Sequence, residues 1–144
     1  MIEIILCEDN EKERALMTDF ISGHVMMENL DMKVALSTAS PNEVLKYVKK
    51  HASGRLYFLD VDLKAEMTGI QLAAQIREVD PKASIVFITT HAELMSLTFE
   101  YAIEAMGYIL KGDYEVTKEK IVKYIRRTVK KEIGTLTSAG KFVA

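Results

Sequence analysis

The sequence contains 144 residues, of which 49% are hydrophobic and 28% are charged, with 7 Gly, 2 Pro and a single Cys. This composition is typical of one globular domain and excludes the disordered, collagen-like and disulfide-stapled classes. No apolar stretch approaches the ~20 residues that a membrane span needs. Acids at Glu3, Glu8 and Asp9 also interrupt any signal-peptide pattern, so we expect a soluble cytoplasmic protein.

The net charge of −2 is unevenly distributed along the chain. Residues 1–110 carry 10 Lys and Arg against 17 Asp and Glu, a net of −7. Residues 111–144 carry 9 Lys and Arg against 4 Asp and Glu, a net of +5. A basic segment of this kind is either a solvated helix face or an arm that binds nucleic acid.

Five short apolar runs have the length and the β-branched or aromatic content of strands. They span residues 2–7, 32–36, 56–59, 85–88 and 108–110. The third and fourth runs are apolar throughout, as a strand covered on both faces requires. Helices on both faces of a parallel sheet would provide that cover.

Between and after these runs, apolar residues recur at steps of three and four, which predicts a helix after each strand. The stripes are Leu16, Met17, Phe20 and Ile21; Val44, Leu45 and Val48; Leu72, Ala73, Ile76 and Val79; Leu94, Leu97, Tyr101 and Ala105; and Ile121, Ile125, Val129 and Ile133. This alternation predicts a doubly wound α/β domain over residues 1–133. Residues 134–144 lack a sustained period and are predicted to be a tail or the start of a linker.

Local signals mark two of the helix boundaries. Ser40 and Pro41, with Glu43 three residues after Ser40, have the pattern of a capping box at the start of the second helix. Asp80 followed by Pro81 predicts the end of the third helix, because a residue before proline is disfavoured in helical geometry.

Polar side chains follow four of the predicted strands. Glu8 and Asp9 end the first strand, Asp60 the third, Thr89 the fourth and Lys111 the fifth. Ligands of doubly wound sheets bind beyond the carboxyl ends of the strands, so we expect these side chains to meet at one edge.

Clustered carboxylates suit Mg²⁺, which prefers oxygen ligands and keeps positions open for phosphate oxygens. A carboxylate beside that metal can attack phosphorus, while a lysine and a hydroxyl stabilise the transferring group. Each residue alone is commonly a loop or packing residue. Their joint occurrence at strand ends predicts phosphoryl transfer to an aspartate.

In these motifs the sequence resembles the receiver domains of two-component response regulators. The likeness lies in the acid pair at residues 8 and 9, in Asp60 within residues 57–63, in Thr89, and in Lys111 at the end of residues 107–111. Residues 57–60 and the segment from His91 to Met106 are similar to the AgrA-type regulators of peptide quorum sensing. The resemblance implies a flavodoxin-like five-stranded parallel sheet with strand order 2-1-3-4-5.

The resemblance also implies a role for each residue. Asp60 would accept a phosphoryl group from a sensor histidine kinase, and Lys111 would pair with a phosphoryl oxygen. Thr89 and Tyr108 would form the switch. Mg²⁺ would be held by Glu8, Asp9, Asp60 and the backbone carbonyl of Asp62. Activation would reshape the face made by the fourth helix, the fifth strand and the fifth helix, where receivers commonly form homodimers.

Three residues depart from the family pattern. Gly112 follows Lys111 where most receivers have a proline, often cis, which leaves this loop freer. Thr90 occupies the position where the family usually has Ala or Ser, and its larger side chain is expected to narrow the access of a phosphoryl group to Asp60. The carboxylate of Asp62 adds negative charge beside Asp60, which bears on metal affinity and on the lifetime of a phosphoaspartate.

Two alternatives differ in function. Asp60 and Asp62 also resemble the first motif of haloacid-dehalogenase-type phosphohydrolases, as nucleophile and general acid. That family normally begins with the nucleophile's strand, whereas here two strands and two helices precede the strand that ends at Asp60. A pseudo-receiver that binds partners without phosphorylation is the other alternative, and the intact residue set argues against it.

The basic segment has a helical pattern. Seven cations flank the last apolar stripe, which places them at solvent-facing positions: Lys118, Lys120, Lys123, Arg126, Arg127, Lys130 and Lys131. A solvated face is the plain interpretation. Pairing with Glu93, Glu100 and Glu104 of the fourth helix across a two-fold dimer is the functional hypothesis.

No DNA-reading element is visible after the fifth strand. AgrA-type regulators carry a separate LytTR DNA-binding domain beyond the receiver, so we expect this chain to be a receiver fragment rather than a natural stand-alone receiver. Contact with DNA would then need that absent domain. Cys7, on an apolar strand, is predicted to be a buried core thiol rather than a redox sensor. His91 is predicted to border the site as a loop residue.

Overall fold

The computed structural model describes residues 1–50 and 54–143, and it has a five-stranded parallel sheet at its centre. The strands are β1 (Ile2–Cys7), β2 (Met32–Thr38), β3 (Leu56–Leu59), β4 (Ser84–Thr89) and β5 (Gly107–Leu110). They pair in the order β2-β1-β3-β4-β5. The doubly wound α/β class and the strand order are therefore confirmed.

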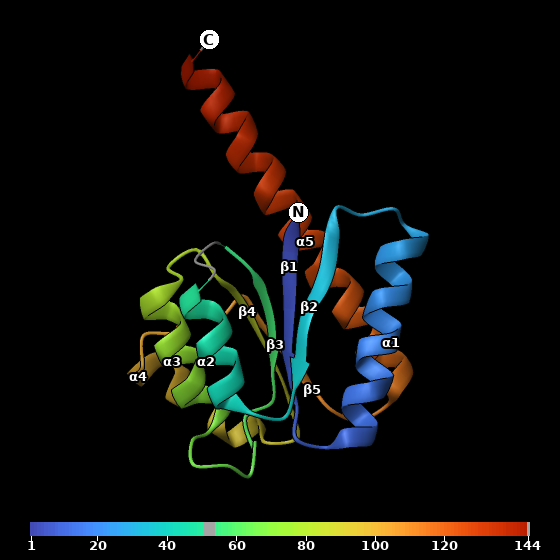
Figure 1. Cartoon of the computed structure of the whole chain (residues 1–144), viewed down its shortest axis with the longest axis vertical. Coiled ribbons are helices and arrows are strands. Elements are labelled where there is room, and N and C mark those ends of the chain that lie inside the picture. The colour runs from blue at the N-terminus through green and yellow to red at the C-terminus, as the bar shows by residue number, and fades with distance from the viewer. Residues whose placement is uncertain (51–53, 144) are drawn as a thin grey trace.

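Helices cover both faces of the sheet (Figure 1). One face is covered by α1 (Glu11–Met27) and α5 (Tyr114–Val143), and the other by α2 (Pro41–Lys50), α3 (Gly69–Val79) and α4 (Leu97–Glu100). A single 3-10 turn, η1 (Ala92–Leu94), precedes α4. Within the described residues, no helix combines the length and the apolar character that crossing a membrane requires.

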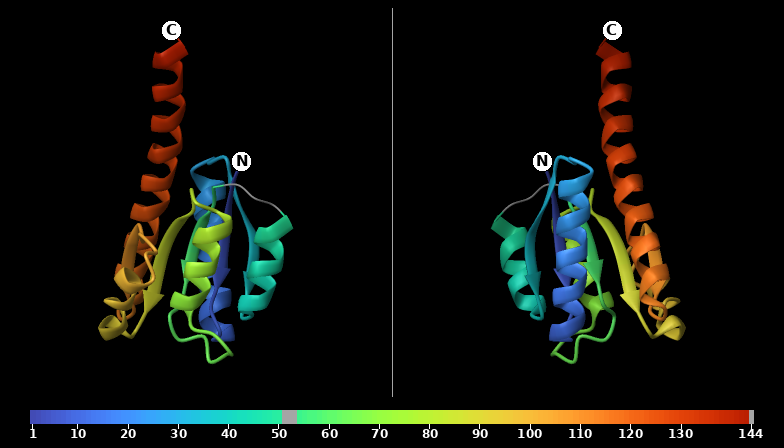
Figure 2. Two further views of the ribbon diagram at one scale, coloured as in Figure 1. Left: turned by 90° about the vertical axis from the view of Figure 1, so that its left-hand side faces the viewer. Right: turned by 90° about the vertical axis from the view of Figure 1, so that its right-hand side faces the viewer.

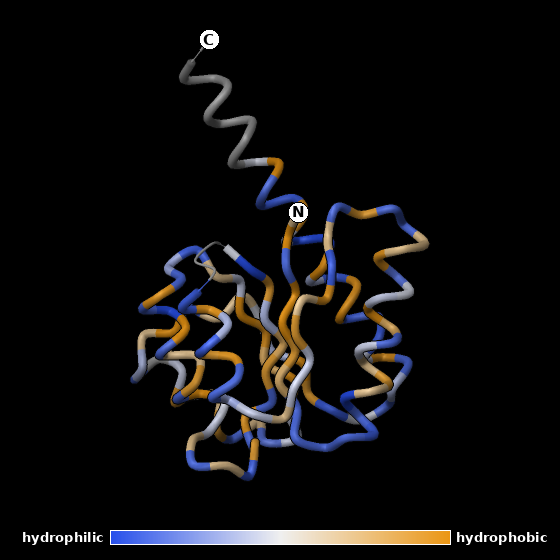
Figure 3. Tube along the Cα trace, viewed as in Figure 1, coloured by the Kyte–Doolittle hydropathy of each residue, from blue (hydrophilic) through white to orange (hydrophobic). Residues whose placement is uncertain are grey.

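The core has two parts, one on each side of the sheet. Successive side chains of a strand point to opposite faces, so Tyr57 and Leu59 pack towards α2 and α3, whereas Leu56 and Phe58 pack towards α1 and α5. Every residue of β3 and β4 is buried, as the uninterrupted apolar runs 56–59 and 85–88 predict, and the polar ends of β4, Ser84 and Thr89, are buried with them. Figure 3 shows the resulting band of hydrophobic residues along the central strands.

The loops at the carboxyl edge of the sheet begin and end at defined caps. The backbone N–H of Glu43 donates to Ser40 Oγ at 3.3 Å, but the Glu43 carboxylate accepts a hydrogen bond from Thr38 Oγ1 at 2.8 Å, so the predicted capping box forms only in part. A complete capping box joins Thr68 and Gln71 at the start of α3. Helix α3 ends at Val79, before Asp80, as predicted.

The fourth helix is much shorter than its apolar stripe predicts. Helix α4 contains only residues 97–100, so Tyr101 and Ala105 lie beyond its end. Of the three acids assigned to this helix, only Glu100 belongs to α4; Glu93 lies in η1, and Glu104 follows the helix. The prediction of a single helix over Leu94–Ala105 is wrong.

Tertiary contacts end α4 early. Ala102 has a left-handed φ of 53°, and the N–H of the fully buried Ile103 donates to the carbonyl of Thr98, which is the pattern of a Schellman C-cap. The Arg77 guanidinium then donates to the carbonyl oxygens of Ile103 at 2.8 Å and Glu104 at 3.2 Å. These bonds satisfy backbone groups that a longer helix would have used internally.

Helix α5 continues beyond the body of the domain. It runs to Val143, so residues 134–143 extend the helix where the sequence lacks a clear period. Figure 2 shows this helix projecting from the end of the sheet at which β1 begins. Whether residues 134–144 serve as a linker stays a prediction.

Candidate functional site

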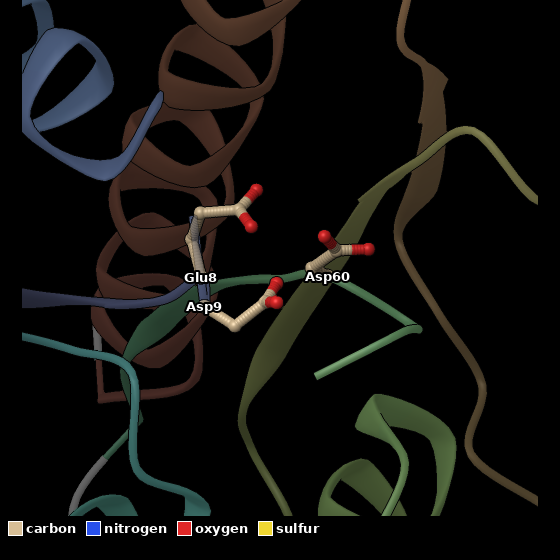
Figure 4. A group of neighbouring side chains, drawn as sticks. All are labelled: Glu8, Asp9 and Asp60. Carbon is tan, nitrogen blue, oxygen red and sulfur yellow. The ribbon is translucent and has the colours of Figure 1, made fainter. Parts of the chain in front are cut away.

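Three carboxylates meet at the carboxyl ends of β1 and β3. Oxygen atoms of Glu8, Asp9 and Asp60 all lie within 4.8 Å of one another, and Figure 4 shows their side chains converging. Glu8 and Asp60 are buried and Asp9 is half-buried. The parallel register brings them together, because Cys7 pairs with Leu59 and each acid follows its strand. The structure therefore brings together the three acids that the sequence singles out.

Lys111 supplies positive charge to this cluster. Its Nζ lies 2.6 Å from Glu8 Oε1 and 3.0 Å from Asp60 Oδ2. A third carboxylate, Glu13 Oε2 on the first turn of α1, lies 2.7 Å from the same nitrogen. The N–H of Lys111 also donates to the carbonyl of Thr89, which fixes the start of the loop after β5. Lys111 is thus held at the site by both side-chain and backbone bonds.

Burial and the neighbouring charges alter two pKa values. Burial raises the pKa of Glu8 to about 8, and the negative charge of Asp60 contributes, although the Lys111 hydrogen bond opposes both. Burial lowers the pKa of Lys111, but its hydrogen bonds to Glu13, Glu8 and Asp60 outweigh this, so the pKa lies above its usual value. Lys111 therefore stays charged at neutral pH, whereas Glu8 readily takes up a proton.

The backbone around Asp60 depends on a close approach by α3. A Cβ added to Gly69 would stand 1.8 Å from the carbonyl oxygen of Asp60, so only glycine fits there. The N–H of Gly69 donates to the carbonyl of Val61 at 2.8 Å, and the N–H of Asp62 donates to Asp60 Oδ1 at 3.2 Å. These contacts fix the loop that presents Asp60.

The two predicted switch residues lie on neighbouring strands but have separate partners. Thr89 is fully buried, and its Oγ1 accepts a hydrogen bond from the N–H of His91 at 3.0 Å. The Tyr108 hydroxyl pairs with Thr98 Oγ1 of α4 at 2.6 Å, and its ring stacks on Phe87. Tyr108 therefore links β5 to α4, and its role in a switch stays a prediction.

The carboxylate of Asp62 turns towards the loop after β4. Its Oδ2 lies 3.5 Å from His91 Nε2, while His91 Nδ1 lies 3.0 Å from Glu93 Oε1. The hydrogen bond to Glu93 raises the pKa of His91, although its side chain is exposed. His91 thus borders the site, and its ring joins the loop after β3 to the segment after β4.

Three residues at the site were missed by the sequence analysis. They are Glu13, Gly69, and Arg14, whose Nη1 donates to the carbonyl of Glu8 at 2.8 Å. The N–H of Glu13 donates to Asn10 Oδ1 at 2.9 Å. Asn10 as an N-cap could therefore have predicted that Glu13 lies in the first turn of α1. No local pattern indicates that it contacts Lys111.

Cys7 lies in the core immediately before the acids. Its side chain is fully buried, and burial raises the pKa of the thiol to about 12. A thiol with this pKa is almost entirely protonated at neutral pH and is a poor nucleophile. The predicted role as a core residue agrees with this environment.

The chemistry of the site fits a divalent cation. The ammonium of Lys111 contacts three carboxylates, those of Glu8, Glu13 and Asp60, and Asp9 lies in the same acidic cluster as Glu8 and Asp60. Two of these acids are buried, where unbalanced negative charge is costly. A hard cation with oxygen ligands would balance this charge and leave room for phosphate oxygens.

Comparison with known proteins identifies relatives of the chain. The family model for the response regulator receiver domain matches residues 4–126. The accessory gene regulator protein A of Staphylococcus epidermidis is 41% identical over 121 residues, covering 84% of this chain and 51% of that protein. Its counterpart from Staphylococcus aureus is 39% identical over the same shares. The chain thus spans about half the length of these curated relatives.

Solved structures agree with the sequence comparison. The response regulatory domain of protein mrkE from Klebsiella pneumoniae has a TM-score of 0.73 at 26% identity, covering 90% of this chain and 96% of that one. The response regulator TrrA from Thermotoga maritima, solved with Mg²⁺ and BeF, shares the fold with a TM-score of 0.65 at 23% identity, covering 86% and 99%. The haloacid-dehalogenase alternative gains no support from these matches. The chain belongs to the response regulator receiver domain family.

Proposed function

We propose that this receiver domain accepts one phosphoryl group on Asp60 from the phosphohistidine of a sensor histidine kinase. The proposal rests mainly on the position of Lys111, whose Nζ lies 3.0 Å from Asp60 and 2.6 Å from Glu8. Asp9 belongs to the same cluster of carboxylates. Asp60 is the acid of this cluster that stands at the end of the central strand β3.

The chain's own residues supply most of the chemistry. A carboxylate oxygen of Asp60 attacks phosphorus, the bond from phosphorus to the donor's imidazole nitrogen breaks, and an acyl phosphate forms. Lys111 pairs with a phosphoryl oxygen, and Thr89 donates its hydroxyl to another. Glu8, Asp9, Asp60 and the backbone carbonyl of Asp62 would hold Mg²⁺, which neutralises charge on the phosphoryl oxygens when bound.

Asp60→Asn is expected to abolish phosphorylation. Acetyl phosphate with Mg²⁺ should add one phosphoryl group to the parent protein and none to this variant, because an amide oxygen is a poor nucleophile. Intact-mass spectrometry makes the measurement, and Asp62→Asn is the matched control that should still accept one group. A parent that takes no label would favour the pseudo-receiver. Continuing release of inorganic phosphate from simple phosphomonoesters would favour a phosphohydrolase.

The effect of Mg²⁺ on stability should grow with pH. The pKa of Glu8 is raised from 4.5 to about 8, so the folded protein holds a proton there that the unfolded chain loses. The free energy of unfolding of the metal-free protein should therefore fall as pH rises through this window. Mg²⁺ needs ionised Glu8, so its stabilising effect should increase over the same window.

Urea unfolding with and without Mg²⁺, at about pH 5.5 and about pH 8.5, measures this dependence. Glu8→Gln should flatten both trends, because the glutamine side chain does not titrate. An unchanged pH dependence in Glu8→Gln would assign the effect to another group.

Phosphorylation is proposed to act on the face formed by α4, β5 and α5. Strand β5 is an edge of the sheet, and Tyr101 and Leu110 are 44% and 49% exposed beside it. Of the seven cations that flank the apolar stripe of α5, six are exposed, while Lys118 is half-buried and lies over the rings of Phe20 and Tyr114. Glu100 and Glu104 are exposed near β5, which offers opposite charges for a two-fold homodimer.

Charge reversal on α5 should weaken this dimer. Arg126→Glu or Lys123→Glu is expected to reduce phosphorylation-dependent dimerisation by roughly tenfold, since like charges would then face one another. Sedimentation of the phosphorylated variants measures the dissociation constant. Lys46→Glu on α2 makes the same charge change away from this face and is the control. Equal dimerisation of all variants would contradict the assignment of this face.

The wider assignments belong to the same proposal. A domain of this kind acts as a switch with self-phosphotransfer and slow self-dephosphorylation rather than as an enzyme with turnover. By similarity to the accessory gene regulator proteins, it would serve peptide quorum sensing in the cytoplasm and regulate transcription. Contact with DNA would require a LytTR domain outside residues 1–144.

A further inference from the structure

All three donors of Lys111 are directed at carboxylates. An ammonium group has three N–H bonds, and Lys111 Nζ lies within hydrogen-bond distance of Glu8, Glu13 and Asp60, at 2.6, 2.7 and 3.0 Å. Glu8 and Asp60 belong to the acidic cluster, but Glu13 does not. Glu13 therefore holds Lys111 from outside the set of residues proposed to bind the metal and the phosphoryl group.

The position of Glu13 is fixed by the start of α1. Its N–H donates to the N-cap side chain of Asn10 at 2.9 Å, which places Glu13 three residues after the cap. A carboxylate in the first turn of a helix is favoured by the helix dipole. The Glu13 side chain is 47% exposed, whereas those of Lys111 and Asp60 are 17% and 8% exposed. Glu13 thus approaches Lys111 from the solvent side.

A phosphoryl group on Asp60 needs a donor from Lys111, and all of its donors are already engaged. The hydrogen bond from Lys111 to Glu8 joins two largely buried groups, so water cannot easily replace either partner. The hydrogen bond from Lys111 to Asp60 already points to the residue that would carry the phosphoryl oxygens. The bond to Glu13 is the one with an exposed partner, which water can solvate in place of Lys111. It is therefore the contact that phosphorylation most readily exchanges.

We propose that Glu13 is a positioning residue that competes with the phosphoryl group for Lys111. This inference rests on the proposed function. In the unphosphorylated protein Glu13 holds the ammonium towards α1, and in the phosphorylated protein that contact weakens as Lys111 turns to the phosphoryl oxygens. Glu13 thereby opposes the phosphorylated state, and the first turn of α1 is coupled to the occupancy of Asp60.

The test measures the affinity for beryllofluoride, an analogue of the aspartyl phosphate, in saturating Mg²⁺. Glu13→Gln should bind beryllofluoride roughly three- to tenfold more tightly than the parent, because a neutral amide holds an ammonium less strongly. Glu13→Asp should also bind more tightly, since the shorter side chain keeps its charge but loses the contact. Tyrosine fluorescence or calorimetry follows the titration.

Glu11→Gln is the matched control. Glu11 is exposed in the same first turn, and its side chain makes no hydrogen bond or ion pair with the described residues, so this variant removes the same charge without touching Lys111. Its affinity should stay within about twofold of the parent, as expected for a solvent-screened charge. In a Lys111→Met background, Glu13→Gln should have no effect, because a residue that acts through Lys111 then has nothing to act on.

Each outcome decides the inference. If Glu11→Gln and Glu13→Gln raise the affinity for beryllofluoride equally, the cause is a general effect of charge, and the inference is overturned. It is also overturned if Glu13→Gln still raises this affinity in the Lys111→Met background. Weaker binding by Glu13→Gln would mean that Glu13 supports the phosphorylated state, and would also overturn it. A parent that neither binds beryllofluoride nor accepts a phosphoryl group would overturn the proposed function and, with it, this inference.

Discussion

Gly69→Ala is expected to lower the free energy of unfolding by about 3 kcal/mol, at the upper end of the range for an overpacked core site. The new methyl group would stand 1.8 Å from the carbonyl oxygen of Asp60 and 3.0 Å from the Cα of Val61. Both are backbone atoms, so no side-chain rotation relieves the clash. Either α3 moves away from β3 or the loop that presents Asp60 is displaced.

The same substitution should therefore impair both stability and phosphorylation. Urea unfolding measures the loss of stability, and the rate of labelling by acetyl phosphate in the folded fraction measures the loss of phosphorylation. Gly23→Ala is the matched control, because nothing lies within 4 Å of its added Cβ in the middle of α1. That change should raise stability by about 1 kcal/mol through helix propensity. A Gly69→Ala variant as stable as the parent would contradict the close approach.

Lys111→Met should slow phosphorylation by roughly 100-fold, the equivalent of about 3 kcal/mol lost from a partly buried charge pair. Methionine keeps much of the apolar length but removes the ammonium that lies within 3.0 Å of Asp60, Glu8 and Glu13. Without it, the carboxylates of Glu8, Glu13 and Asp60 lose the ammonium that contacts all three of them, and Arg14, a cation beside the cluster, donates to the backbone carbonyl of Glu8 rather than to a carboxylate.

Rates of labelling by acetyl phosphate at several Mg²⁺ concentrations test this expectation. Higher Mg²⁺ should restore part of the lost rate, because the ion neutralises some of the same charge. Lys131→Met, which removes an ammonium that donates to Lys82 and Ser84 at the other end of the sheet, is the control and should be phosphorylated normally. Equal rates for the two variants would exclude Lys111 from the reaction.

The order of elements and the meeting of the acids could be predicted from the sequence. Alternating strands and helices leave few topologies, and a parallel sheet gathers the residues that follow its strands at one edge. Glu8 and Asp9 follow β1 and Asp60 follows β3, and these acids meet because the two strands are neighbours, in the order that the resemblance to receiver domains implies. Local patterns predicted the elements and the residues that follow them, and the resemblance supplied the order of the strands.

Other features depend on contacts that no local pattern contains. Glu13 and Lys111 are 98 residues apart, and their meeting depends on how α1 packs beside α5, which follows the loop that carries Lys111. The close approach of Gly69 to Asp60 likewise depends on how α3 sits against β3. In α4 the helical period continues to Ala105, but burial of Ile103 and the hydrogen bonds of Arg77 override it.

The early end of α4 has a consequence for the energetics of switching. A helix of four residues has almost no internal hydrogen-bond ladder, so its conformation depends on its neighbours rather than on its own cooperativity. The Tyr108–Thr98 hydrogen bond and the Arg77 contacts supply that support from β5 and α3. Small free energies then suffice to redistribute its conformers, since about 1.4 kcal/mol changes a population ratio tenfold. One hydrogen bond such as that of Tyr108 is of this size, so the proposed role of Tyr108 as a switch residue requires no larger change in free energy than the loss of this bond.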